Sequence, residues 1–473
     1  MASKNITFEQ IPASIRKPGK YAEFNLKLAV RTLPGNLQKT LIIGNRLAAG
    51  TVPAGTIVDV FSDAEAATYF GHGSIAHRMV KSALKTNRYL ALQVLPVDDA
   101  GAGIAATCTL TITGPATGVG VLTANIGDDL VQIAVASGDA ATAMAASLKA
   151  QFDALPDLPL SAGVAAGVLT LTAKNKGTLG NGIKVSASVT APGVGAVATA
   201  MTNGATDPTL TAALAIAFTA GHNVLASPWT DSTSLAALRN HLDNAGDGIE
   251  KRGAVAAVGF TGTLSAATTA MIGCNPQRIT GALVPNTTTP AYEVAASYAA
   301  LIAFEEDPAM PLNTLVLSSV SAPPLANWLG RNEQENCLYN GITPTEVGPG
   351  NVVQIVRAVT GYIVNATGTP DISLLDLTTI RTLDYTRKAI VERESLRFPR
   401  SKKSKRVKAQ MREEILDVLY KLEELEILEN VADNEPGVLV EDDLQDPNRL
   451  DARIPADVVN GLHVVANRID LLL

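Results

Sequence analysis

Two stretches of the sequence alternate short apolar strands with helical segments, and this alternation constrains the fold more than any other feature. In the first stretch, the sequence predicts strands at 40–44 and 89–97 and helices at 63–70 and 74–85. In the second, it predicts strands at 222–226, 254–260 and 279–285 and helices at 232–244, 265–273 and 291–305. Such alternation is typical of a parallel or mixed sheet that helices cover on both faces.

The segment between these stretches has a different pattern. Short alternating strands are predicted at 108–113, 121–126, 131–135, 168–173 and 183–189, with one alanine-rich helix at 139–152. Glycine, proline and asparagine separate the strands, as turns require. We therefore expect a compact β-rich domain inserted into a loop of the α/β domain, which is tolerated when the two ends of the insert lie close together.

The last third of the chain has a third pattern of predicted elements. The last third predicts a long strand at 352–364, helices at 374–392 and 410–430, and a short helical turn at 446–456. The predicted fold class is α/β (mixed α+β) and multidomain, with an inserted β-rich domain and extended terminal arms. The predicted division is an N-terminal arm at 1–25, a core α/β domain at 26–101 and 206–350, an inserted outer domain at 102–205, a C-terminal domain at 351–460 and a C-terminal arm at 461–473.

Composition limits the class of protein. Apolar residues make up 47% of the chain, which is enough for several buried cores, and the net charge of -7 argues against a nucleic-acid binder. We expect no signal peptide and no membrane span, and hence a soluble protein made in a cytoplasm. Cys108, Cys274 and Cys337 lack metal-ligand spacing and are expected to be free, buried thiols.

No motif supports catalysis or a cofactor. Gly101-Ala102-Gly103 begins a pattern resembling a dinucleotide fingerprint, but the next element is a predicted strand, whereas the fingerprint needs a helix. His72 and His77 are interpreted as surface histidines at a helix start, and Glu305-Glu306-Asp307 as a helix end. We therefore expect no enzyme activity, no cofactor and no metal. A nucleotide-binding α/β enzyme is the disfavoured alternative.

A basic run at 397–412 contains no acidic residue, and residues 413–443 contain twelve acidic residues and one basic residue, Lys421. Adjacent blocks of opposite charge suit electrostatic docking between proteins, although a solvated helix face would look the same. Nucleic-acid binding would require aromatic residues between the basic ones, and these are missing. The candidate contact residues are Arg400, Lys402, Lys403, Lys405, Arg406 and Lys408.

Several segments in collinear order resemble the tail sheath protein of Mu-like contractile phages, and together they span nearly the whole chain. These segments are Leu169–Asn181, Glu250-Lys251-Arg252-Gly253, Ala303–Leu312, Asn340-Gly341-Ile342-Thr343-Pro344, Val356–Tyr362, Asp446-Pro447-Asn448-Arg449-Leu450 and Ile454-Pro455. One departure is Gly361, where the family pattern has a threonine, and we expect a locally looser strand there.

The resemblance implies a structural subunit of the virion tail, assembled in the host cytoplasm. Subunits of this family would form hexameric rings that stack helically around a tail tube, with baseplate and terminator proteins as further partners, and with neither nucleic acid nor membrane insertion. Contraction would drive the tube through the host envelope without a nucleotide.

The apolar C-terminus fits such an assembly, because a free apolar strand is a liability unless it pairs with the sheet edge of a neighbour. The candidate arm residues are Val464, Val465, Ile469, Leu471 and Leu472. Two alternatives fit the sequence less well: a cell-surface adhesin would need a secretion signal, and a tail tube protein would be much shorter and mainly β.

Overall fold

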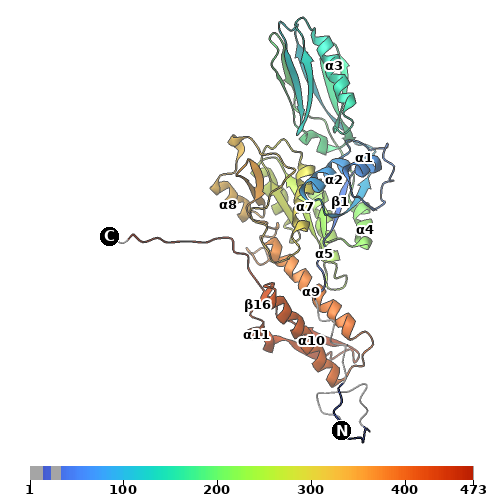
Figure 1. Cartoon of the computed structure of the whole chain (residues 1–473), viewed down its shortest axis with the longest axis vertical. Helices are drawn as coiled ribbons and strands as arrows, with labels where there is room; N and C mark the ends of the chain where they lie inside the picture. Colours follow the sequence, from blue (N-terminus) through green and yellow to red (C-terminus); the bar gives the residue numbers. More distant parts are fainter. Residues whose placement is uncertain (1–13, 23–32, 472–473) are drawn as a thin grey trace.

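The computed structural model describes residues 14–22 and 33–471, and these residues form an elongated molecule (Figure 1). A β-rich region with helix α3 lies at one end, an α/β core lies in the middle, and the long helices α9 and α10 lie at the other end. The predicted class, a mixed α+β multidomain fold, is confirmed. Of the predicted N-terminal arm, residues 1–13 and 23–25 lie outside the described residues.

The core is built on an eight-stranded sheet with the order β15-β14-β13-β12-β11-β1-β3-β2. The strands from β3 to β14 run parallel, and the outer strands β2 and β15 are antiparallel to their neighbours. Their bounds are β1 Lys39–Asn45, β2 Val58–Asp59, β3 Ala91–Val97, β11 Val224–Ala226, β12 Val255–Phe260, β13 Ile279–Leu283, β14 Thr343–Gly348 and β15 Val352–Ile355.

Helices cover both faces of this sheet, as the alternation predicted. Within β1, Leu41 and Ile43 are buried on one face and Ile42 on the other, because successive side chains of a strand point to opposite sides. One face packs against α1 Asp63–Phe70, α2 Ile75–Thr86 and α7 Ala291–Phe304. The other packs against α4 Thr211–Ala220, α5 Ser232–Ala245, α6 Leu264–Cys274 and α8 Arg331–Tyr339.

All the strands of the β-rich region lie between β3 and β11 in the sequence. They form two antiparallel sheets around a core of their own. One has the order β10-β4-β8-β7 and the other β6-β5-β9. The bounds are β4 Ala105–Thr113, β5 Gly120–Ile126, β6 Asp129–Val135, α3 Ala141–Ala154, β7 Leu160–Ala165, β8 Val168–Lys176, β9 Val185–Val189 and β10 Gly195–Ala198.

The two ends of this inserted segment are joined. Ile104 and Ala205 form an antiparallel bridge whose two N–H···O bonds measure 2.9 and 3.1 Å. The insert can therefore enter and leave the core at one place without opening the sheet, which is the condition under which such an insertion is tolerated. The domain boundaries themselves, at 102 and 205, remain a prediction.

A buried ion network fixes the insert to the core. Arg78 of α2 is 4% exposed, and its guanidinium lies 2.8 Å from Glu293 of α7 and 2.6 Å from Asp129 of β6. Burial raises the pKa of Glu293, and the Arg78 charge opposes that shift. The network thus binds two core helices to the first residue of a strand in the insert.

Replacing Arg78 with Met should lower the free energy of unfolding by about 3 kcal/mol, because Glu293 would then be a buried carboxylate without its partner. Since burial raises the pKa of Glu293, this carboxyl binds a proton more readily in the folded variant than in the unfolded variant. The loss should therefore be largest near pH 8 and shrink toward about pH 5. Denaturant titration at both pH values measures this, with the exposed Arg88→Met as control; equal losses in the two variants would contradict it.

The C-terminal region is an antiparallel pair of long helices with small strands beside them. Arg393 of α9 lies 3.0 Å from Glu414 and 2.5 Å from Asp417 of α10, so ion pairs join the helices beside their apolar contact. The bounds are α9 Leu377–Arg397, α10 Lys405–Glu424, β16 Leu428–Glu429, α11 Val431–Asn434, β17 Leu439–Asp442, β18 Leu450–Arg453 and β19 Asp457–Val458.

The predicted long strand at 352–364 is wrong beyond Ile355, where β15 ends. At Val359, hydroxyl groups replace a strand partner: Thr343 Oγ1 accepts from the Val359 N–H at 3.0 Å, and Thr280 Oγ1 donates to the Val359 carbonyl at 2.7 Å. The expected loosening at Gly361 is also wrong. A Cβ atom at Gly361 would lie 2.5 Å from Pro276, so the backbone packs too closely there for any other residue.

Two smaller predictions are corrected as well. The segment 446–456 is not helical: β18 pairs with β17 after a turn in which the Asp443 carboxylate accepts the N–H groups of Gln445 and Asp446. His77 is not a surface residue. It is fully buried, and its ring nitrogens contact the Gly73 N–H and the Asp63 carboxylate.

Candidate assembly interface

The C-terminal arm leaves the body at His463. β19, the last strand within the described residues, pairs with β16. Beyond it, the Asn313 amide donates to His463 Nδ1 at 3.0 Å, and His463 Nε2 lies 3.6 Å from Asp376. Burial and the nearby Arg357 lower the pKa of His463, while Asp376 opposes the shift. His463 is therefore the anchor at the root of the arm.

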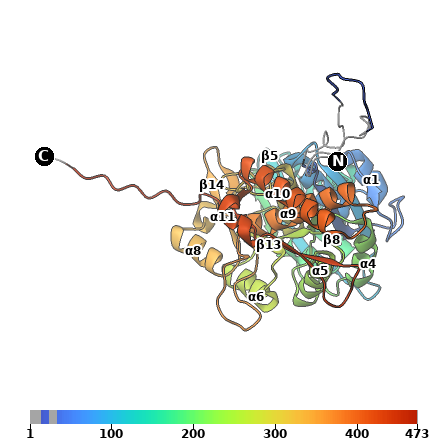
Figure 2. The same ribbon diagram turned by 90° about the horizontal axis from the view of Figure 1, so that it is seen from below.

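Beyond His463 the arm extends away from the body, as both views show (Figure 1 and Figure 2). Its predicted contact residues Val464, Val465, Ile469 and Leu471 are 79%, 68%, 94% and 82% exposed; Leu472 lies outside the described residues. The only ion pair of this stretch among the described residues is local, between Arg468 and Asp470. Four large apolar side chains thus face solvent on an extended backbone with free hydrogen-bonding groups.

The hairpin of β17 and β18 offers the complementary feature. These two strands pair only with each other in the part of the chain that the structure describes, so both outer edges of the hairpin are open. Val440 packs into the core beneath α10, whereas Leu439 is 41% exposed. An open strand edge on a firmly packed hairpin is suited to accept a further strand.

The basic run forms the start of α10 and the loop before it. Two of its predicted contact residues are used inside the chain: Lys403 and Lys408 lie 3.2 and 3.0 Å from Asp442, and they lower the pKa of that carboxyl. The other four predicted contact residues are exposed and form no ion pair within residues 14–22 and 33–471: Arg400, Lys402, Lys405 and Arg406. The surface beside them is hollowed, with a volume of about 920 Å³ lined by Lys402, Lys403, Lys405, Lys408 and Asp442, among others.

This basic surface costs the fold some stability. α10 begins at Lys405, and the Ser404 hydroxyl caps it by accepting from the Val407 N–H at 3.3 Å. Lys405 and Arg406 therefore lie in the first turn, where the helix dipole disfavours cations by about 0.3–1 kcal/mol each. Neither forms an ion pair within the described residues that would offset this cost, which favours a role in binding. Sequence alone could not place Asp442 beside Lys403 and Lys408, because 34 residues separate it from Lys408.

A nucleotide site is not supported. In a doubly wound sheet the nucleotide crevice lies at the carboxyl ends of the strands where the strand order reverses, here between β1 and β11. That edge is bridged by the chain itself: Asp99 accepts from Asn45 at 2.7 Å and from Asn175 of the insert at 3.0 Å. Gly101–Gly103 leads into β4, a strand, as predicted.

Residues 14–22 and 33–471 contain no group of three or more His, Cys, Asp or Glu side chains that could hold a metal ion. None of their helices has the length and apolar character of a membrane span.

Comparison with known proteins decides the family. The Mu-like prophage FluMu tail sheath protein of Haemophilus influenzae is 32% identical over 99% of this chain and 100% of its own length. The chain belongs to the phage tail sheath family. The family models of the tail sheath central domain and the tail sheath C-terminal domain match residues 203–361 and 369–471.

Solved structures share the fold. A sheath tail protein from Desulfitobacterium hafniense aligns with a TM-score of 0.52 and 16% identity, covering 94% of this chain and 97% of the other. The PVC sheath of an extracellular contractile injection system, in its contracted state, aligns with a TM-score of 0.51 and 9% identity, covering 97% and 98%. This tail sheath protein is thus a structural component of a phage tail, and the enzyme alternative finds no support.

Proposed function

We propose that this sheath protein polymerises as hexameric rings stacked helically around a tail tube. The observation that carries the proposal is the pair of complementary features in one chain: an extended apolar arm after His463, and the open-edged hairpin β17–β18. Each arm would add a strand to the hairpin of a neighbouring copy. Each chain would donate its arm to one neighbour and accept the arm of another on its hairpin. Such a contact is heterologous, so it propagates into rings or helices.

Main-chain pairing would supply the affinity of each link. At about 1 kcal/mol net per hydrogen bond, five bonds give about 5 kcal/mol per arm before side chains are counted. When such links are repeated around a ring, avidity makes the assembly far more stable than a single link would be. The exposed apolar residues of the arm would at the same time leave the solvent.

Contraction would be a rearrangement of rigid subunits that the arms keep connected. The extended sheath would be held kinetically and would relax to a contracted lattice of lower energy, driving the tube through the host envelope. The ion network around Arg78 supports motion of core and insert as one body.

The basic surface of Arg400, Lys402, Lys405 and Arg406 would face the tube or an adjacent subunit. Baseplate and terminator proteins would lie at the two ends of the polymer. Assembly in the host cytoplasm is part of the same proposal.

Negative-stain electron microscopy of the purified full-length protein tests the proposal. We expect hollow, striated tubes once the protein is concentrated. If only compact monomers are found at every concentration and salt condition, with or without the tube protein, the proposal fails.

A further inference from the structure

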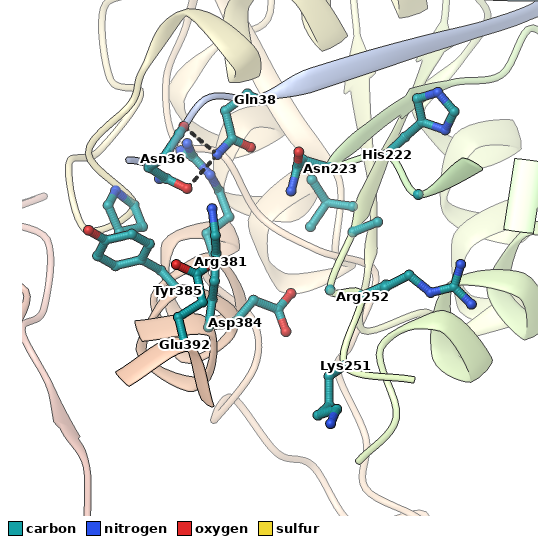
Figure 3. A pocket seen from close by; sticks show the side chains of 16 residues that line it. Asn36, Gln38, His222, Asn223, Lys251, Arg252, Arg381, Asp384, Tyr385 and Glu392 are labelled. Carbon is teal, nitrogen blue, oxygen red and sulfur yellow. Dashed lines mark hydrogen bonds between the residues drawn. The ribbon is translucent and has the colours of Figure 1, made fainter. Parts of the chain in front are cut away.

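A cavity of about 370 Å³ lies at the junction of the core sheet and α9 (Figure 3). It opens at the amino ends of β1, β11 and β12, on the edge of the sheet opposite to the one where doubly wound folds bind nucleotides. Arg381, Asp384, Lys388 and Glu392 line it from α9. Lys251 lines it from the loop before β12. None of the proposed assembly contacts lies here.

The free charges of this cavity are mainly positive. Asp384 is already engaged, with Arg278 at 2.6 Å and Arg387 at 2.8 Å. Lys251, Arg381 and Lys388, in contrast, form no ion pair within the described residues, and Glu392 is the one other acidic residue among the described residues of the lining. The lining therefore has more cationic side chains than free carboxylates.

Among these residues, Arg381 gives the strongest indication of a ligand site. It is 7% exposed; its Nη2 donates to the Glu305 carbonyl, and its Nη1 is buried without a partner. Burial lowers the pKa of Arg381 to about 10, even though Glu305 and Asp307 lie near enough to oppose that shift. A buried guanidinium that has an unused N–H group and forms no direct ion pair is costly unless an acceptor reaches it.

The loop on the opposite wall is held in an unusual conformation. Lys251 has a φ of 57°, a left-handed conformation that a residue with a side chain seldom adopts. It belongs to the segment Glu250-Lys251-Arg252-Gly253. The proposed assembly assigns no role to this segment. Such backbone conformations are often found at ligand-binding sites, where the surrounding structure maintains them.

We infer that this cavity binds an oxyanion, a phosphate or carboxylate group, with Arg381 as the buried anchor and Lys251 and Lys388 at the rim. The guanidinium fork suits the paired oxygens of such a group, and lysine adds a point charge on a flexible stem. A bound anion would join α9 to the amino edge of the sheet and so stiffen the joint between the core and the C-terminal helices. This inference does not depend on the proposed polymer.

Inorganic phosphate is the probe, added to the full-length monomer at fixed ionic strength. With phosphate at ten times its Kd, the Tm should rise by about 2 °C over the matched chloride buffer.

The variant Lys388→Met should bind phosphate about tenfold more weakly than the wild type, as measured by titration calorimetry. The exposed Lys85→Met, which removes the same charge elsewhere, should bind phosphate as the wild type does. Arg381→Met should lose the response to phosphate; if that variant does not fold, Lys388→Met still decides the question.

An unchanged Tm in phosphate, or an equal rise in the wild type and Lys388→Met, would overturn the inference and leave the cavity as a water site. Assembled protein then identifies the natural source of the anion. If a carboxylate of a neighbouring copy fills the cavity, phosphate binding disappears on polymerisation. If the ligand is a free ion, the polymer binds one phosphate per subunit. Failure of the chain to polymerise leaves the monomer measurement intact.

Discussion

A chain that ends at residue 463 is expected to fold as a soluble monomer and to form no sheath. Within the described structure, residues 464–471 form hydrogen bonds and ion pairs only among themselves, so their removal leaves the packed regions intact. The Tm should therefore stay close to that of the full-length monomer. Losing about 5 kcal/mol per subunit link lowers each association constant by more than a thousandfold.

Sedimentation velocity and negative-stain microscopy measure this outcome. The matched control replaces residues 464–473 with a glycine-serine decapeptide, which keeps the length but removes the apolar side chains. We expect the control to assemble far more weakly than the wild type, since a flexible segment must lose more entropy to pair. Striated tubes formed by the truncated chain would refute the arm as the connecting element.

Reversing the charge of Lys402 and Lys405 to Glu should abolish or severely shorten sheath assembly on purified tail tubes. Both side chains are exposed, so the folded monomer should remain stable. Lys403 is left unchanged because it neutralises Asp442 inside the chain. If the partner surface is acidic and complements these lysines, two charge reversals place like charges against each other, which costs several kcal/mol.

The control for this variant is Lys85→Glu with Arg88→Glu, which makes the same change in net charge on an exposed part of the core. Raising the salt concentration should weaken assembly of the wild type, because exposed charges are screened. A variant that fails on tubes but still self-assembles alone would assign the surface to the tube. One that fails in both settings would assign it to a neighbouring subunit. Tails of normal length would exclude the surface from either contact.

Much of the fold could be predicted from local patterns. α1 spans Asp63–Phe70 as predicted, and Asp231 caps α5 by accepting from Thr233 and Ser234, because amphipathic periodicity and capping residues act over a few positions. The predicted strand at 352–364 failed for the opposite reason. Its β-branched residues favour a strand, but the backbone groups of Val359 bond to the hydroxyl groups of Thr280 and Thr343, and the Gly361 N–H donates to the Ile279 carbonyl. Contacts with residues outside 352–364 therefore decide the local conformation.

The candidate site divides in the same way. The basic run and the apolar terminus are local features, so the sequence identified both. Which cations are free was not predictable, because Asp442 approaches Lys403 and Lys408 only when β17 packs against α10. The cavity around Arg381 was likewise invisible, since its walls come from α9 and from strand starts more than a hundred residues earlier.

By itself, the sequence determined the order of the elements, the existence of a separate β-rich insert and the apolar character of the arm, because each follows from residues close together in the chain. Only the tertiary structure decided that the arm leaves the body at His463, that both edges of the β17–β18 hairpin are open, and that Arg381 is buried without an acceptor. These depend on which distant segments share a surface, and burial and pairing arise only where such segments meet.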